Sequence, residues 1–224
     1  MLLFPFATAV IYFYQDITSH YINDTRWGII CLLISFSGLL VRAITVGFVP
    51  KGTSGRNTDQ QIAEALNQTG IYSVVRHPLY LGNFLMWLGL FMFIGLWWFV
   101  VICALMYWLY YERIMFAEEE FLRRNYTDRY EEWARRTPAF WPRLSAWTPS
   151  TLHFSLRNVL KQEYNGLFSM VLSFVLINAI SHLFTEARFE IDKLWQIMFV
   201  VGAIVFIVLR TLKKQTKILD ISGR

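Results

Sequence analysis

The stretch "YSVVRHPLYLGNFLMWLG", residues 72–89, places an arginine, a histidine and a proline directly before a long apolar run. Proline suits the first turn of a helix, because an N–H at that position has no partner within the helix. Pro78 therefore predicts the start of a membrane helix, with Arg76 and His77 at its mouth. The apolar run ends at "FIGLWWF", where Gly95 and a tryptophan pair indicate a turn at the far interface.

The composition is that of an integral membrane protein. The 224 residues are 55% hydrophobic and 17% aromatic, and the mean hydropathy is +0.38, which is too apolar for an ordinary soluble domain. Several apolar segments approach the ~20 residues that cross a hydrocarbon core of ~30 Å. We therefore expect an all-α, polytopic membrane bundle of about six spans. These are residues 27–48, 79–95, 97–116, 166–184 and 195–209, with a weaker sixth span in residues 1–14.

Lysine and arginine are distributed unevenly between the connecting segments. Residues 113–165 carry nine basic residues, whereas the connections near 15–26 and 185–193 carry few. Because cytoplasmic loops are enriched in Lys and Arg, both long polar loops and both termini are expected in the cytoplasm. The net charge of +5 is mainly a topology signal, and it favours anionic lipid over nucleic acid as a partner.

The cysteines and histidines indicate no metal centre. Cys31 and Cys103 lie inside apolar segments and are expected to be buried without a disulfide. The four histidines are scattered, and none has a neighbour at metal-ligand spacing. We predict that no metal is bound.

The helices at 79–95 and 97–116 are predicted to form a hairpin with both outer ends at one face. Glu118 lies roughly 32 Å along the second helix, just beyond the core, and so at the depth of Arg76 and His77. Either charged group alone would be typical of a solvated helix end. Together they predict a site for a zwitterionic or cationic ligand. Its aromatic wall would be Tyr107, Trp108, Tyr110 and Tyr111.

Two motifs flank this hairpin, "TGIYSVVRHPLYLG" before it and "EEEFLRRNYTDRYEEWARRTPAFWP" after it. In this order they resemble motifs of the isoprenylcysteine carboxyl methyltransferases and the related phospholipid methyltransferases, which are membrane enzymes that use S-adenosylmethionine. The resemblance covers residues 65–142. Tyr126-Thr127 stands where the family usually has Phe-Gly, and Trp133 replaces a second tyrosine. The matching residues are Gly70, Tyr72, Arg76, His77, Pro78, Tyr80, Gly82, Glu118, Glu119, Leu122, Tyr130, Arg135, Arg136, Pro138 and Pro142.

The resemblance implies a cytoplasmic S-adenosylmethionine pocket that is closed by the segment after the hairpin. By this carry-over, Arg76 and Glu118 would lie nearest the transferring methyl group as catalytic residues. The methyltransferase core would comprise residues 1–149, and residues 150–224 would form an extension with two further membrane helices. The residues implied to line the cofactor are His77, Tyr80, Gly82, Glu119, Tyr130 and Arg136.

The loop "VPKGTSGRNTDQQIAEALNQTG" suggests the acceptor. Lys51, Arg56 and Asn57, flanked by glycines, suit a phosphate or carboxylate at a headgroup. A flexible loop leading into a surface helix is the alternative. The loop also resembles bacterial relatives thought to methylate the phosphate of lipid A. The preferred prediction is therefore methyl transfer to an anionic membrane lipid in a bacterial inner membrane, followed by prenylcysteine carboxylate and then phospholipid amine.

Two other classes of protein remain open. Membrane sterol and enone reductases resemble the same hairpin and use NADPH, but they typically have a Cys and a Lys-Tyr-Gly pattern where this chain has "EEEFLRRNYT". The paired glutamates favour the methyltransferase. A scaffold or transporter would bind no cofactor, and the sequence shows neither an inverted repeat nor an ionisable residue at mid-span, Arg42 being nearer a span end.

Overall fold

The computed structural model describes residues 3–49 and 66–221, and these form helices without a strand. The prediction of an all-α fold is confirmed. In chain order the helices are α1 (Leu3–Phe13), α2 (Gln15–Ile22), α3 (Thr25–Phe48), the short η1 (Ile71–Ser73), α4 (Pro78–Phe93), α5 (Trp97–Arg136), the short η2 (Leu144–Ala146), α6 (Leu156–Glu186) and α7 (Lys193–Gln215).

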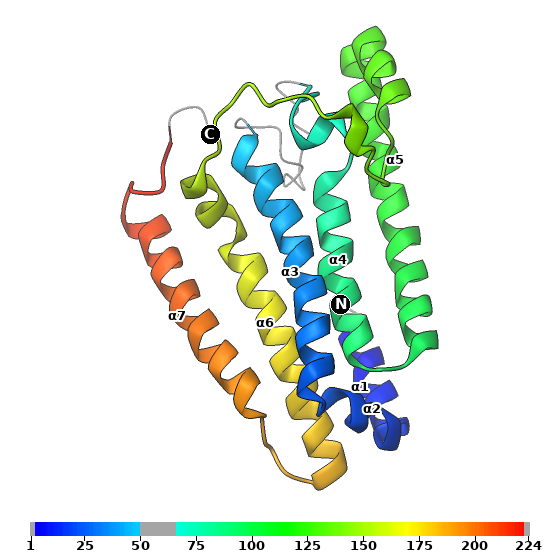
Figure 1. The fold of residues 1–224 in the computed structure, drawn as a ribbon, viewed down its shortest axis with the longest axis vertical. Helices are drawn as coiled ribbons and strands as arrows, with labels where there is room; N and C mark the ends of the chain where they lie inside the picture. The colour runs from blue at the N-terminus through cyan, green and yellow to red at the C-terminus, as the bar shows by residue number, and fades with distance from the viewer. Residues whose placement is uncertain (1–2, 50–65, 222–224) are drawn as a thin grey trace.

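The long helices lie side by side as a tilted bundle, with α5 on one flank and α7 on the other (Figure 1). The upper end in Figure 1 holds the start of α4, the outer part of α5, the start of α6 and the described C-terminal end. The lower end holds α1, α2 and the turns α4–α5 and α6–α7. The described parts of the two long polar segments, before α4 and between α5 and α6, therefore lie at the same end of the bundle, as the charge pattern predicts.

Within the described residues, four helices are long and apolar enough to cross a membrane, namely α3, α5, α6 and α7. Many of their apolar side chains, such as Leu109 on α5 and Ile207 on α7, are exposed on the surface of the bundle, as a lipid-facing surface requires. Together these observations identify an integral membrane protein. Four of the five main predicted spans fall within α3, α5, α6 and α7, and the fifth, 79–95, matches α4 but ends two residues beyond it.

Six spans are not confirmed. Helix α4 has 16 residues and α1 has 11, so α1 extends about 16 Å, roughly half of a hydrocarbon core. Instead of crossing, α1 packs Val10 and Ile11 into the core, and it lies with α2 at the lower end of the bundle (Figure 1).

The helix ends follow from local sequence. Asp24 caps α3 by accepting a 2.9 Å hydrogen bond from the Arg26 N–H, as a short polar side chain does at this position. Pro78 is the first residue of α4, as predicted. Gly95 has φ +80° in the turn between α4 and α5, where a β-carbon would lie 2.3 Å from the Tyr21 ring. The predicted turn at Gly95 is therefore confirmed.

Helices α3 and α4 approach each other unusually closely. A β-carbon on Gly38 would lie 2.4 Å from the Gly82 carbonyl oxygen and 2.6 Å from the Met86 nitrogen. Next to this contact, the Ser35 hydroxyl donates a 2.8 Å hydrogen bond to the Met86 carbonyl. Small residues allow such backbone contact within membranes. This contact sets the position of α4, and hence of Arg76 and His77, relative to α3.

Candidate active site

Charged and titratable side chains meet at the upper end of the bundle, between the start of α4 and the outer part of α5. Arg76 Nε lies 3.2 Å from Glu119 Oε1, and His77 Nε2 lies 2.8 Å from the same oxygen. Glu118 accepts a 2.9 Å hydrogen bond from the Tyr80 hydroxyl and lies 3.7 Å from His77 Nδ1. We call these five residues the charged cluster. Their predicted meeting is confirmed, whereas the role of each residue stays a prediction.

The segment after α5 holds the charged cluster in place from above. Residues 137–148 run alongside residues 70–77 and are bonded to them mainly through the backbone. The Trp133 indole, where the family usually has tyrosine, also donates to the Tyr72 carbonyl at 2.9 Å. The backbone bonds are Arg76 N to Pro138 O (2.9 Å), His77 N to Ala139 O (3.2 Å), Arg143 N to Val74 O (2.9 Å) and Gly70 N to Thr148 O (2.8 Å). This segment therefore covers the residues that the sequence places at the mouth of the hairpin.

The outer part of α5 folds back on itself at Thr127. This residue has φ 39° and ψ −111°, and the chain after it descends beside the preceding helix (Figure 1). Arg123 joins the two arms, because its Nε lies 2.7 Å from Glu131 Oε1 and its guanidinium lies 5.7 Å from the Tyr130 ring centre. Thr127 occupies the position where the family usually has glycine, so it adopts a conformation that glycine takes at lower cost.

The fold-back brings Tyr130 against Glu119, outside the membrane-spanning part of α5, which ends near residue 116. Burial alone would raise the pKa of Glu119, but the hydrogen bond from His77 and the Arg76 charge hold this pKa below its usual value. Burial, together with the Glu119 charge, raises the pKa of the Tyr130 phenol. Glu119 is therefore ionised and Tyr130 neutral near pH 7.

Among the described residues, Arg76 Nε and the Tyr130 hydroxyl find no hydrogen-bond partner of good geometry, although both atoms are buried. Both face the Glu119 carboxylate, which lies near them but is poorly aligned. Buried donors in proteins are ordinarily satisfied. The Glu118 side chain is 29% exposed. The cluster thus offers unsatisfied donors and an accessible carboxylate to a polar ligand that carries both charges.

A second group of polar side chains, which the sequence did not predict, lies deeper in the bundle. Arg42 on α3 forms a buried, two-pronged ion pair with Glu163 on α6, with N–O distances of 2.7 and 2.9 Å. A third guanidinium nitrogen donates to Asn83 Oδ1 on α4 at 2.6 Å. We call Arg42, Asn83 and Glu163 the Arg42 network. The sequence hints at this network only because ionisable side chains such as Arg42 and Glu163 are rare within or beside apolar spans.

Comparisons with known proteins agree with this arrangement. The sequence model of the phospholipid methyltransferase family matches residues 26–129. The cobalt-zinc-cadmium resistance protein CzcN of Cupriavidus metallidurans is 33% identical over 168 residues, which are 70% of this chain and 74% of that protein. The protein-S-isoprenylcysteine O-methyltransferase of Schizosaccharomyces pombe is 32% identical over 86 residues, 38% of this chain and 35% of that enzyme. This chain belongs to the isoprenylcysteine and phospholipid methyltransferase family.

A further relative is the nickel-cobalt-cadmium resistance protein NccN of Alcaligenes xylosoxydans xylosoxydans, which is 37% identical over 131 residues. The match covers 58% of this chain and 58% of that protein. No solved structure matches the chain. The family match ends at residue 129, before α6 and α7.

The other predicted ligand-binding residues of this methyltransferase family member are not all at the charged cluster. Gly82 faces α3, where a β-carbon would lie 2.6 Å from Arg42 Cγ. Arg136 is exposed and pairs with Glu132 one turn earlier on the same helix. Packing and a surface ion pair account for these two positions, and their cofactor roles stay predictions. Lys51, Arg56 and Asn57 lie outside the described residues.

The predicted aromatic wall is only partly present. Tyr107 and Tyr111 stack with ring centres 4.1 Å apart, and the Tyr107 hydroxyl donates a 2.8 Å hydrogen bond to the Tyr80 carbonyl. Tyr110 is 64% exposed, and Trp108 packs instead on Phe140. Tyr107 and Tyr111 therefore border the site, because the helical period turns the other two side chains away from Tyr80.

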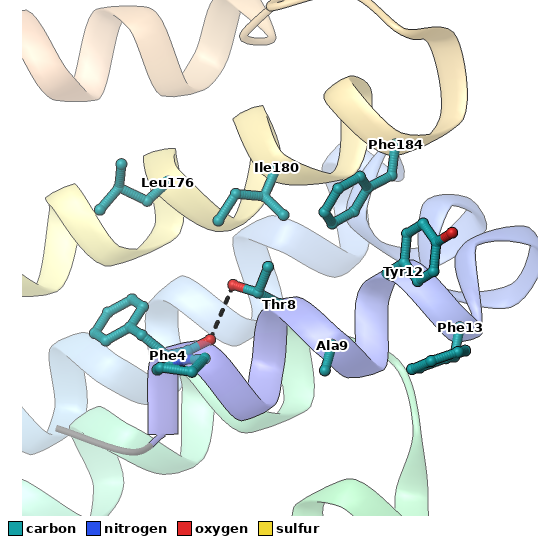
Figure 2. Close-up of a pocket in the computed structure, with 9 residues that line it drawn as sticks. Phe4, Thr8, Ala9, Tyr12, Phe13, Leu176, Ile180 and Phe184 are labelled. Carbon is teal, nitrogen blue, oxygen red and sulfur yellow. Dashed lines mark hydrogen bonds between the residues drawn. The ribbon is translucent and has the colours of Figure 1, made fainter.

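Figure 2 shows a different hollow, an apolar groove of about 600 Å³ between α1 and α6. The Thr8 hydroxyl in this groove is satisfied by the Phe4 carbonyl at 2.9 Å. The groove has no charged lining residue, which suits hydrocarbon and not a polar cofactor. Its lining residues are Phe4, Pro5, Thr8, Ala9, Tyr12, Phe13, Leu176, Ile180 and Phe184. Across the described ranges, no group of three or more His, Cys, Asp or Glu side chains is placed to hold a metal ion.

The strain at Thr127 gives a testable expectation. A non-glycine residue held in a sparsely populated backbone conformation destabilises the fold by about 1 to 3 kcal/mol. Glycine removes this strain, but it loses more backbone entropy on folding, which offsets about 0.5 to 1 kcal/mol of the gain. Thr127→Gly should therefore raise the melting temperature of the detergent-solubilised protein. Asn125→Gly, an exposed and helical position two residues earlier, should lower it slightly. Equal effects of the two glycines would contradict strain at Thr127.

Proposed function

We propose that this protein is an integral membrane methyltransferase that moves the methyl group of S-adenosylmethionine to a lipid acceptor, with an anionic headgroup such as a lipid phosphate preferred. The observation that carries this proposal is the charged cluster. Its members stand at the positions of the family's two motifs: Arg76 and His77 meet at the Glu119 carboxylate, and Tyr80 bonds to the Glu118 carboxylate. Prenylcysteine carboxylate and phospholipid amine are the alternative acceptors.

The residues fit the proposed cofactor in chemical type. S-adenosylmethionine carries a carboxylate, an ammonium group, hydroxyls and a sulfonium cation. Arg76 and Tyr130 supply the buried donors that make no good hydrogen bond, and Glu118 and Glu119 supply negative charge. When bound, the cofactor would provide an electrophilic methyl group on sulfur.

The protein's own contribution is alignment and exclusion of water. The Tyr80 hydroxyl holds the Glu118 carboxylate, whose negative charge would balance the sulfonium cation. Arg76 would orient an acceptor oxygen, since a guanidinium presents several donors in one plane. The segment 137–148 covers the cluster and limits access of water. An anionic oxygen acceptor loses no proton on methylation, so no general base is required.

The proposed orientation places the upper end of the bundle in the cytoplasm, the compartment that supplies S-adenosylmethionine. It is supported by the basic residues of the segments gathered there, which positive-inside topology predicts. We propose the bacterial inner membrane as the location. We also propose residues 1–149 as the methyltransferase core and residues 150–224 as an extension that packs against it.

The relatives' names favour an anionic acceptor. Two of them are named as resistance proteins for cobalt, cadmium, and nickel or zinc. Methyl esterification of a phosphate or carboxylate removes one negative charge, which lowers the attraction of the membrane surface for divalent cations. Methylation of an amine would not remove that charge. We therefore propose that methyl transfer by this protein reduces the anionic charge of a membrane lipid.

Mass spectrometry of lipids from cells with and without the protein tests this function. The expected result is one lipid class that gains the mass of a CH₂ group only when the protein is present, with a labelled methyl group supplied as methionine. A shift on an amine lipid would select the phospholipid amine alternative. No methylated lipid, together with calorimetric binding of NADPH and none of S-adenosylmethionine, would indicate a reductase. Binding of neither cofactor would indicate a scaffold.

A further inference from the structure

The Arg42 network links the C-terminal extension to the charged cluster. Arg42 and Glu163 are 121 positions apart in sequence, and their side chains are only 10% and 5% exposed. Arg42 lies six residues before the end of α3, and Asn83 five residues after the start of α4. Each is therefore about 8 to 9 Å below the mouth of the site, near the edge of the hydrocarbon.

A contribution to the stability of the fold is not enough to explain why the protein buries this ion pair. Removing two charges from water costs as much as their attraction returns, and a well-packed apolar pair is often equally stable. Ionisable side chains at membrane depth are instead typical of functional sites. The orientation of the Arg42 guanidinium is also fixed. Its Nε and Nη2 donate to Glu163, and its Nη1 donates to Asn83.

The contacts continue upward from Asn83 to the charged cluster. A guanidinium only donates hydrogen bonds, so Arg42 determines that the Asn83 oxygen points toward it. The Asn83 amide nitrogen then faces the Tyr111 hydroxyl at 3.5 Å. The Tyr111 ring lies 5.2 Å from the Tyr80 ring, and Tyr80 holds Glu118. A continuous series of contacts thus runs from α6 to a carboxylate of the candidate site.

We infer that Glu163 is a positioning residue for this site: it holds Arg42, and through Arg42 it orients Asn83 and Tyr111 beneath Tyr80 and Glu118. The C-terminal extension is therefore a working part of the active site. Glu163 also neutralises Arg42, whose free cation would otherwise compete with the cationic sulfonium for Glu118 or attract an anionic headgroup too deeply. This inference rests on the proposed function for its catalytic consequence, but the structural link can be measured separately.

The first test compares Glu163→Gln and Arg42→Lys with Asp192→Asn. The control disrupts another polar contact of the extension at the opposite end of the bundle, where Asp192 pairs with His182 at 3.1 Å and Asn178 at 2.7 Å. The readouts are affinity for S-adenosylmethionine by calorimetry, kcat and KM for labelled methyl transfer to vesicles of total lipid from the host cells, and hydrogen exchange.

For Glu163→Gln and Arg42→Lys we expect only a small loss of cofactor affinity, because Arg76, His77 and Glu119 keep their contacts. We also expect a roughly ten- to hundredfold lower kcat/KM for the lipid and faster exchange in residues 78–84 and 107–119. Asp192→Asn should lower the melting temperature without these changes. Normal turnover and unchanged exchange in the two network variants, with only a lower melting temperature, would overturn the inference. Absence of methyl transfer in the parent protein, with the exchange effects present, would refute the proposed function and leave the positioning role standing.

The double variant Arg42→Glu with Glu163→Arg provides a second test if a single variant does not fold. It should restore the ion pair and the melting temperature. A carboxylate at position 42 accepts hydrogen bonds, so the Asn83 amide would turn over and present its oxygen to Tyr111. Turnover should therefore stay low while stability recovers. Recovery of both together would show that the pair only stabilises the bundle.

Discussion

Glu119→Gln is expected to weaken binding of S-adenosylmethionine at least about a hundredfold and to abolish methyl transfer. One Glu119 oxygen contacts both Arg76 Nε at 3.2 Å and His77 Nε2 at 2.8 Å. Removing one partner of a buried charge pair costs about 3 kcal/mol or more, which is a hundredfold in affinity. Calorimetric titration of the purified protein with S-adenosylmethionine measures the loss.

Glu120→Gln is the matched control for this experiment. Glu120 is the next residue on α5 and pairs with Arg123 and Arg124, whose side chains are 47% and 76% exposed. Exposed pairs contribute less than about 1 kcal/mol, so its affinity should change by no more than a few fold. Equal losses in the two variants would show that Glu119 acts only through the general charge of the helix.

The lowered pKa of Glu119 predicts the pH dependence of the same binding. A carboxylate with a depressed pKa stabilises the folded cluster at every pH above its ordinary value near 4.3. That stabilisation is lost only as the pH falls through the lowered pKa. Cofactor binding by the parent protein should therefore persist below pH 5 and fail at more acidic pH, provided that the bundle remains folded.

Gly38→Ala is expected to produce the largest loss of stability. The new methyl carbon would lie 2.4 Å from the Gly82 carbonyl and 2.6 Å from the Met86 nitrogen. Both atoms belong to backbone, which cannot rotate away as a side chain can, so α3 and α4 must separate. Overpacking costs about 1 to 3 kcal/mol even among movable side chains, and we expect more than 3 kcal/mol here. Thermal unfolding in detergent, followed by circular dichroism, measures it.

Gly202→Ala on α7 controls for the change in helix propensity. A β-carbon there would meet Val171 at 3.5 Å, an ordinary contact, and alanine favours the helix by about 1 kcal/mol. Its melting temperature should stay the same or rise. A Gly38→Ala protein as stable as the Gly202→Ala protein would mean that α3 and α4 are not in backbone contact.

Much of the candidate site follows from local rules. Pro78 marks the start of α4 because proline is tolerated in the first turn of a helix, and the rise of 1.5 Å per residue places Glu118 and Glu119 opposite Arg76 and His77. These features depend on chain length and on neighbours close in sequence.

Other features depend on which helices pack together. Arg42 and Glu163 meet because α6 packs against α3, and the family resemblance ends before α6. Gly82 matches a family motif, yet its neighbours Gly38 and Arg42 come from another helix. The apolar opening segment is compatible with a span, but the described α1 has only 11 residues and lies against the core.

The sequence by itself determined that the chain crosses a membrane, where the hairpin begins and that Arg76 and His77 lie at the depth of the acidic run after it, because hydropathy, helical rise and a proline act along the chain. Only the tertiary structure decided that Arg42 is neutralised by Glu163 and that the extension reaches the site. An apolar helix face is nearly uniform in composition, so its partner is selected by the close fit of particular side chains, which are distant in sequence.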